Sequence, residues 1–198
     1  MKKIISILGL GLLCLLFTSM NGGGHQAKAS SPPLSSDKPG DMERAALSKM
    51  EFVVGEWEGE GWSLTPSGQR ARFWVKESYR YRGDKDLMDM EGRFGGILPD
   101  GTRSAEREYS LGILYYDRER RQYRSWHYSN DGVVFTVDVD VDIERKTAQY
   151  RRTTTGGESS RFSIRIDENW VWISTVEILT PDKTWLQVVE FRMRRLKS

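Results

Sequence analysis

Hydrophobic and polar residues alternate along most of this chain with a period of two. The clearest case is residues 133–142, where Val137, Val139 and Val141 alternate with aspartates. Successive side chains of a β-strand point to opposite faces, so this pattern predicts strands that bury one face. By the same criterion we predict strands over residues 56–64, 70–81, 86–94, 106–117, 122–129, 146–153, 161–166, 170–180 and 184–194.

Turn-forming residues separate these segments, as in Pro99-Asp100-Gly101 and Asn130-Asp131-Gly132. About ten strands at regular spacing with tight turns predict an antiparallel meander, and a long meander tends to close into a barrel. Residues 42–52 instead carry Ala46, Leu47 and Met50 at helical spacing. We therefore expect an all-β fold, a single antiparallel up-and-down barrel of about ten strands with a short N-terminal helix.

The N-terminal segment differs from the rest of the chain. Lys2 and Lys3 precede an apolar run over residues 4–17, and Ala27-Lys28-Ala29 follows it. A short positive segment, an apolar run too short to span a membrane and a small-residue cleavage site are typical of a secretory signal. We expect residues 1–29 to be a signal peptide, residues 30–41 a disordered linker and residues 42–198 the barrel domain. The mature protein is then exported, to the periplasm or the extracellular space, without stable membrane insertion.

Composition narrows the chemistry of the mature domain. Cys14 lies in the signal segment, so no thiol remains for a disulfide, a nucleophile or a metal ligand. Among the two histidines, His127 alone follows the cleavage site, which excludes a multi-histidine metal site within one chain. Cleavage also leaves 27 basic and 28 acidic residues. A nearly neutral domain gives no electrostatic reason to bind nucleic acid, so we expect neither nucleic acid nor a metal.

The segment Gly55-Glu56-Trp57-Glu58-Gly59-Glu60-Gly61 opens the first predicted strand. This G-x-W-x-G-x-G pattern resembles the opening of the calycin barrels, which include lipocalins, fatty-acid-binding proteins and nitrobindins. It is most similar to nitrobindin-type barrels and to a bacterial family of secreted lipocalin-like domains of uncharacterised function. Glu91-Gly92-Arg93 and residues 185–193 are similar to that bacterial family too. The resemblance covers residues 45–195 and implies a calycin-like barrel.

Two further expectations come from this resemblance. In lipocalins an arginine near the last strand covers the tryptophan of the opening motif, which implies an arginine over Trp57. Nitrobindin-type barrels bind haem through a histidine near the C-terminus, but no histidine follows His127. We therefore expect no haem and no other cofactor. The candidates for the covering arginine are Arg192, Arg194 and Arg195.

Carboxylates on predicted apolar faces are the candidates for a binding site. Glu77 shares a face with Phe73, Val75 and Tyr79, and Glu190 shares a predicted face with nearby aliphatic residues. A carboxylate in such a place is either paired with an arginine or has a raised pKa, and either can mark a site. The candidate ligand-binding residues are Glu77, Tyr79, Glu91, Trp126, Glu177 and Glu190.

Two other motifs are interpreted as structural. His127 lies between Trp126 and Tyr128 near the end of a predicted strand, where we expect it to pack between aromatic side chains at the rim of the barrel. The aspartates of residues 138–142 are spaced like the ligands of a calcium loop. Ile143 occupies the position where that loop needs glycine, so we expect solvated carboxylates there.

The aromatic content and the lack of nucleophile motifs favour non-catalytic binding of a small hydrophobic or aromatic ligand in the lumen. A cofactor-independent lumen enzyme that uses Glu, Tyr and Arg is the first alternative. A filled barrel that serves as a structural or interaction module of the cell envelope is the second. The sequence leaves open the identity of the ligand, the oligomeric state and whether the lumen is open.

Overall fold

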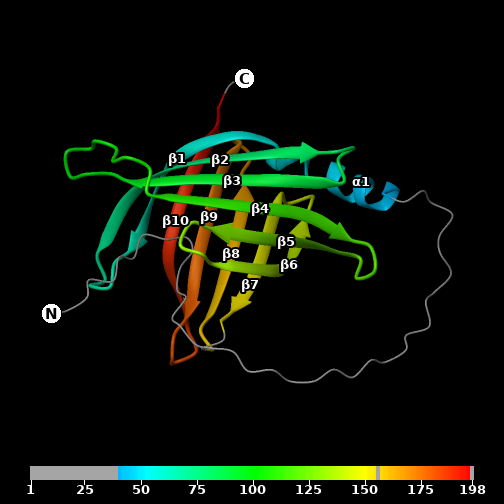
Figure 1. Cartoon of the computed structure of the whole chain (residues 1–198). Helices are drawn as coiled ribbons and strands as arrows, with labels where there is room; N and C mark the ends of the chain where they lie inside the picture. The colour runs from blue at the N-terminus through cyan, green and yellow to red at the C-terminus, as the bar shows by residue number, and fades with distance from the viewer. Residues whose placement is uncertain (1–39, 155–156, 197–198) are drawn as a thin grey trace.

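Ten antiparallel strands close into a barrel in the computed structural model, which describes residues 40–154 and 157–196 (Figure 1). Each strand pairs with the next along the chain, and the first pairs with the last. This confirms the predicted all-β up-and-down barrel. The strands are β1 (Gly55–Leu64), β2 (Arg70–Arg82), β3 (Leu87–Gly96), β4 (Glu108–Asp117), β5 (Gln122–Ser129), β6 (Val134–Asp142), β7 (Thr147–Thr153), β8 (Ser159–Ile166), β9 (Val171–Leu179) and β10 (Trp185–Arg195). The predicted signal peptide and nearly all of the predicted linker lie outside the described residues.

A short helix, α1 (Asp41–Ser48), and a 3-10 turn, η1 (Glu51–Val53), precede β1. The sequence predicts one helix over residues 42–52. The structure divides it because the backbone N–H groups of Lys49 and Met50 donate to carbonyls three residues back. Such bonds tighten and end an α-helix. Within residues 40–154 and 157–196, no helix is long and apolar enough to cross a membrane.

The helix closes one end of the barrel (Figure 1). Leu47 is completely buried, and the carbonyl groups of α1 accept hydrogen bonds from two strands. The Tyr81 hydroxyl donates to the Leu47 carbonyl at 3.0 Å, and the Tyr123 hydroxyl donates to the Ala46 carbonyl at 2.7 Å. Because these carbonyls belong to the last turn of the helix, the tyrosines satisfy groups that the helix itself leaves free.

Trp57 fills the same end of the barrel and has no exposed surface. Its Nε1 donates to the Val53 carbonyl at 2.8 Å, and its ring meets Trp172 edge to face at 5.2 Å. The Arg195 guanidinium lies 4.8 Å from the ring centre and donates to the Phe52 carbonyl at 2.8 Å. The expected arginine cover of Trp57 is therefore confirmed, and Arg195 provides it.

The two glycines after Trp57 allow β10 to approach β1 closely. A Cβ atom on Gly59 would lie 1.8 Å from the Arg192 carbonyl oxygen, and one on Gly61 would lie 2.3 Å from the Glu190 carbonyl oxygen. Neither position accommodates a side chain without moving backbone. The repeated glycine of the opening motif therefore serves barrel closure.

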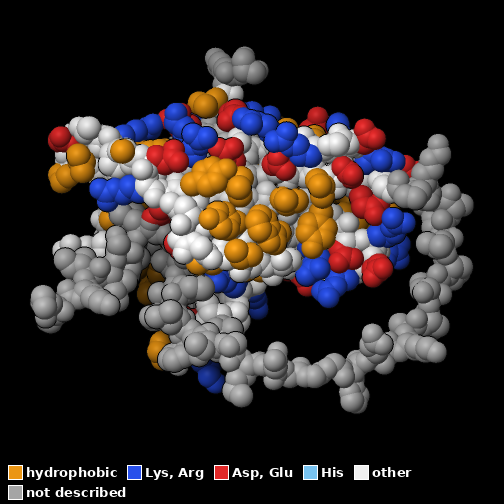
Figure 2. All heavy atoms as spheres, viewed as in Figure 1, with side chains coloured by type: hydrophobic (Ala, Val, Ile, Leu, Met, Phe, Trp, Pro, Cys, Tyr) orange, Lys and Arg blue, Asp and Glu red, His pale blue; other side chains and the backbone are white. Residues whose placement is uncertain are grey.

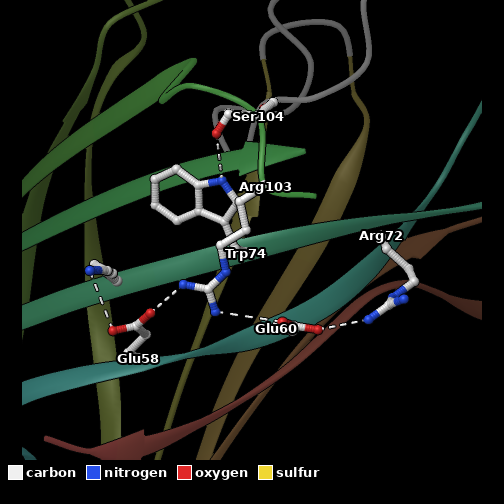
Figure 3. A network of polar contacts seen from close by, with 7 residues as sticks. Glu58, Glu60, Arg72, Trp74, Arg103 and Ser104 are labelled. Carbon is white, nitrogen blue, oxygen red and sulfur yellow. Dashed lines mark hydrogen bonds and ion pairs between the residues drawn. The ribbon is translucent and has the colours of Figure 1, made fainter. Parts of the chain in front are cut away.

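A long connection covers part of the outer surface (Figure 3). Residues 97–107 join β3 to β4, and the Ser104 carbonyl accepts a 3.0 Å hydrogen bond from Trp74 Nε1. Trp74 is only 8% exposed although it lies on the outer side of β2. Arg103 of the same connection pairs with Glu58 and lowers the pKa of that carboxyl. Tryptophan burial and an ion pair thus hold this connection against the barrel wall.

Candidate functional site

The lumen is not filled, because a cavity of about 120 Å³ lies inside the barrel. Its floor is formed by Met50, Val53 and Trp172, beside the helix end. It extends to Tyr128 and Ser129, near the end of β5, and Tyr128 is 36% exposed. An apolar cavity of roughly 150 Å³ is enough to bind benzene, so this one suits a molecule of about that size.

Small residues on β3 and β4 leave the space for this cavity. Gly92 lies beside Glu77 in the strand register, and Ser110 lies beside Gly92. Gly112 is the next lumen-facing residue of β4, between Met90 and His127. A Cβ atom on Gly112 would lie 2.4 Å from the Met90 methyl carbon. Any larger residue there would therefore push Met90 into the cavity.

Glu77 is the carboxylate that faces this cavity. Burial raises the pKa of Glu77 to about 7, although the Tyr79 hydroxyl donates a 2.7 Å hydrogen bond to its Oε2 and opposes that rise. No ion pair joins Glu77 to a described residue, and neither burial nor this hydrogen bond supplies a positive charge. Its carboxyl group keeps some accessible surface because the cavity lies in front of it.

Aromatic rings form much of the wall around Glu77. Tyr79 packs against Trp172 with ring centres 4.8 Å apart, and Tyr150 stacks on Phe162 at 5.1 Å. Burial raises the pKa of the Tyr150 phenol, and the nearby Glu77 charge raises it further. The phenols therefore stay protonated and serve as neutral hydrogen-bond groups inside the lumen.

His127 also lies inside the lumen, and its predicted place at the rim is wrong. Its ring stacks on Phe135 at 4.7 Å and lies 5.4 Å from the Tyr150 ring. Burial, and secondarily the charge of Arg152, lowers the pKa of His127 to about 4, so the imidazole is neutral at pH 7. Its Nε2 is buried without a hydrogen-bond partner among the described residues, as is the Ser125 hydroxyl oxygen.

The structure brings three of the six predicted site residues to the cavity. Glu77 and Tyr79 meet inside it, and Glu91 borders it. The Glu91 carboxylate differs from that of Glu77 because it accepts hydrogen bonds from Arg93 at 2.7 and 2.9 Å. It belongs to an ion pair on the outer side of β3.

The other three predicted residues lie outside the lumen. Glu177 is paired with Arg161 across the outer face of β8 and β9. Glu190 accepts hydrogen bonds from Gln187 and Arg192 at 3.0 Å. A bulge between Gln187 and Val189 changes which side of β10 faces inward, so Glu190 does not share the inner face of the residues before it.

Trp126 is on the outer face of β5, because its neighbours Ser125 and His127 line the cavity. Figure 2 shows hydrophobic side chains gathered on this side of the barrel, with charged side chains around them. Trp126 therefore cannot contact a ligand in the lumen in this arrangement. Within the described residues, no three His, Cys, Asp or Glu side chains are grouped to hold a metal ion.

Comparisons with solved structures show the fold of this chain. Rv2717c from M. tuberculosis superposes with a TM-score of 0.55 at 12% identity and covers 77% of this chain and 98% of its own. The S-type phycobiliprotein lyase CpeS from Guillardia theta gives a TM-score of 0.52 at 12% identity, covering 80% and 96%. Both are calycin-like, lipocalin-like ten-stranded barrels. No family model and no curated protein sequence matches the chain. The finer likeness to nitrobindins stays a prediction.

Proposed function

We propose that this protein binds a small, largely apolar or aromatic molecule in the lumen of its barrel. The observation that carries this proposal is a cavity that contains buried polar atoms without partners, on His127 and Ser125. Leaving a buried donor or acceptor unsatisfied costs about 1–3 kcal/mol, and native proteins rarely tolerate it without a reason. A ligand that fills the cavity and meets these atoms supplies that reason.

The fold neighbours are consistent with this role. CpeS is a phycobiliprotein lyase by name, so a barrel of this architecture has been adapted to a specific function. The predicted signal peptide over residues 1–29 favours a role outside the cytoplasm, in the periplasm or the extracellular space. We place ligand binding in the mature, exported form.

A ligand-observed NMR screen with a library of small aromatic and aliphatic molecules tests the proposal. The blocking variant is Ser125→Leu, which fills part of the cavity and removes an unpartnered hydroxyl. The matched control is Thr136→Leu, which adds the same side chain at an exposed position of β6. We expect saturation transfer for wild type and the control and its loss in the blocked variant. Equal transfer in all three proteins would show that binding does not involve the lumen.

Catalysis in the same lumen is the second candidate function. It is favoured by Glu77, whose pKa of about 7 suits a general acid or base at neutral pH. Tyr79 is in direct contact with it, whereas no arginine lines the cavity. Molecules recovered from the binding screen after long incubation distinguish the two roles. Chemical conversion that Glu77→Gln abolishes indicates an enzyme, and recovery of unchanged molecules indicates a binding protein.

A further inference from the structure

We propose that the lumen ligand is a small organic cation, an amine with an apolar body, whose ammonium group pairs with Glu77. The inference rests on the proposed binding function and adds the charge of the ligand to it. It would distinguish this barrel from one that holds fatty acids or other carboxylates.

The first argument is the missing counter-charge at Glu77. The other glutamates predicted as site residues each have an arginine partner: Glu91 with Arg93, Glu177 with Arg161 and Glu190 with Arg192. Glu77 is hydrogen-bonded to the Tyr79 hydroxyl and has no ion pair with any described residue. A buried carboxylate is normally paired, because its transfer out of water is costly. A cationic ligand completes the pair that the chain leaves incomplete.

The second argument is the sign of the charges in the cavity. Its lining contains two carboxylates and no lysine or arginine. Arg152 lies over the Phe135 ring at 4.3 Å, and its charge acts on His127 and Tyr150. The pKa of Glu77 is determined by burial and by Tyr79. An anionic ligand would therefore meet Glu77 with no positive group beside it.

The third argument is the aromatic wall. Six aromatic side chains line the cavity besides His127, which stays neutral: Tyr79, Phe94, Phe135, Tyr150, Phe162 and Trp172. The negative face of an aromatic ring attracts a cation with about 0.5–2 kcal/mol, more where water is excluded. A carboxylate surrounded by such rings offers both a charge partner and a low-polarity surface, which together suit an ammonium group on an apolar body.

Binding of such a cation is linked to a proton. Free Glu77 is partly protonated at neutral pH, and the ammonium group favours its carboxylate, so the carboxyl releases its proton to solvent as the ligand binds. The groups that act on Glu77 from the neighbouring strands are the phenols of Tyr79 and Tyr150, with the neutral His127 ring beside Tyr150. None of these titrates between pH 6 and pH 8, so Glu77 determines the pH dependence.

Isothermal titration calorimetry with three probes of similar shape tests the proposal. Benzylamine is a cation, benzyl alcohol is neutral and benzoate is an anion. For the wild-type protein at pH 8 we expect benzylamine to bind at least about 10-fold more tightly than benzyl alcohol, and benzoate not to bind, because charged hydrogen bonds contribute roughly 1.5–3 kcal/mol. The benzylamine affinity should rise about 10-fold from pH 6 to pH 8.

Glu77→Gln is the decisive variant, because the amide oxygen can still accept the Tyr79 hydroxyl. We expect it to lower the benzylamine affinity at least about 10-fold, to leave benzyl alcohol unchanged and to remove the pH dependence. Glu177→Gln, on the outer surface, should change none of these values.

The outcomes separate this inference from the binding function on which it rests. Equal affinity for benzylamine and benzyl alcohol, or unaltered benzylamine binding in Glu77→Gln, would overturn the cationic ligand while lumen binding stands. Preferential binding of benzoate would overturn it as well. If no probe binds but the library screen finds lumen ligands, the cation assignment fails alone. If the screen also finds none, both proposals fail.

Discussion

The two ends of the barrel interior use similar residues in opposite ways. At the end closed by α1, Trp57 and Trp172 are fully buried, and the indole N–H of each donates to a nearby oxygen. Around the cavity, His127 Nε2 has no partner in the described part of the chain, and Glu77 has no counter-charge there. Both regions are built by the same alternating strands, so the difference lies in which polar atoms are satisfied.

This difference separates residues that hold the fold from residues that hold a ligand. A packed, satisfied end contributes stability through buried area and hydrogen bonds. A polar cavity costs stability, which is acceptable if a bound molecule restores the missing contacts. Mutations at the two ends should therefore change stability in opposite directions.

Trp57→Ala should have the largest effect. It removes a fully buried tryptophan with its hydrogen bond to Val53 and its contact with Trp172. Core substitutions of this size cost about 3–5 kcal/mol of unfolding free energy, measured here by urea denaturation. The comparison is Tyr150→Phe in the cavity wall, for which we expect a loss below about 1 kcal/mol. Similar losses for both variants would mean that the two ends are equally packed.

Glu77→Gln should stabilise the ligand-free protein by roughly 2–3 kcal/mol at pH 8. The folded pKa of Glu77, about 7, is above its ordinary value of 4.5, so the folded state holds its proton more tightly than the unfolded chain. That group therefore lowers stability as pH rises from about 4.5 to above 7, and the amide removes this loss. Denaturation at pH 5 and pH 8 checks it, since the gain should nearly vanish at pH 5.

His127 should contribute a pH dependence of opposite sign and similar size. Its folded pKa of about 4 is below the ordinary 6.5, so its contribution is present above pH 6.5 and is lost as pH falls towards 4. Between pH 4.5 and 6.5 the slopes of Glu77 and His127 oppose each other, and wild-type stability should be nearly constant. Glu77→Gln should reveal the rising slope, and His127→Phe the falling one. A variant that keeps the flat profile would refute the assignment of that residue.

Arg195→Ala should have the smallest effect, about 1–2 kcal/mol of unfolding free energy, because it loses one cation–π contact and one hydrogen bond to the Phe52 carbonyl. Arg194→Ala, at the exposed neighbouring position, should change stability by less than about 0.5 kcal/mol. Equal thermal shifts for the two variants would show that the arginine cover of Trp57 contributes nothing.

The fold could be predicted because each strand shows its own period of two, as in residues 133–142. Glu77 and Tyr79 were predictable for the same reason, since β2 keeps one face consistently apolar. β5 gives the contrary signal: its inward residues include Ser125 and His127, whereas Trp126 faces outward. A strand with polar residues inside and an aromatic residue outside reverses the usual pattern, which is common at functional sites. Glu190 could not be placed because one bulge in β10 inverts the alternation.

Native mass spectrometry of the mature protein, purified from the cells that make it, tests the central claim most directly. We predict the mass of the chain plus one small molecule, and the mass of the chain alone for Ser125→Leu purified in the same way. A wild-type protein that appears only at its own mass, and that acquires no ligand from a library of small apolar and aromatic molecules, would contradict the claim that the lumen is a binding site.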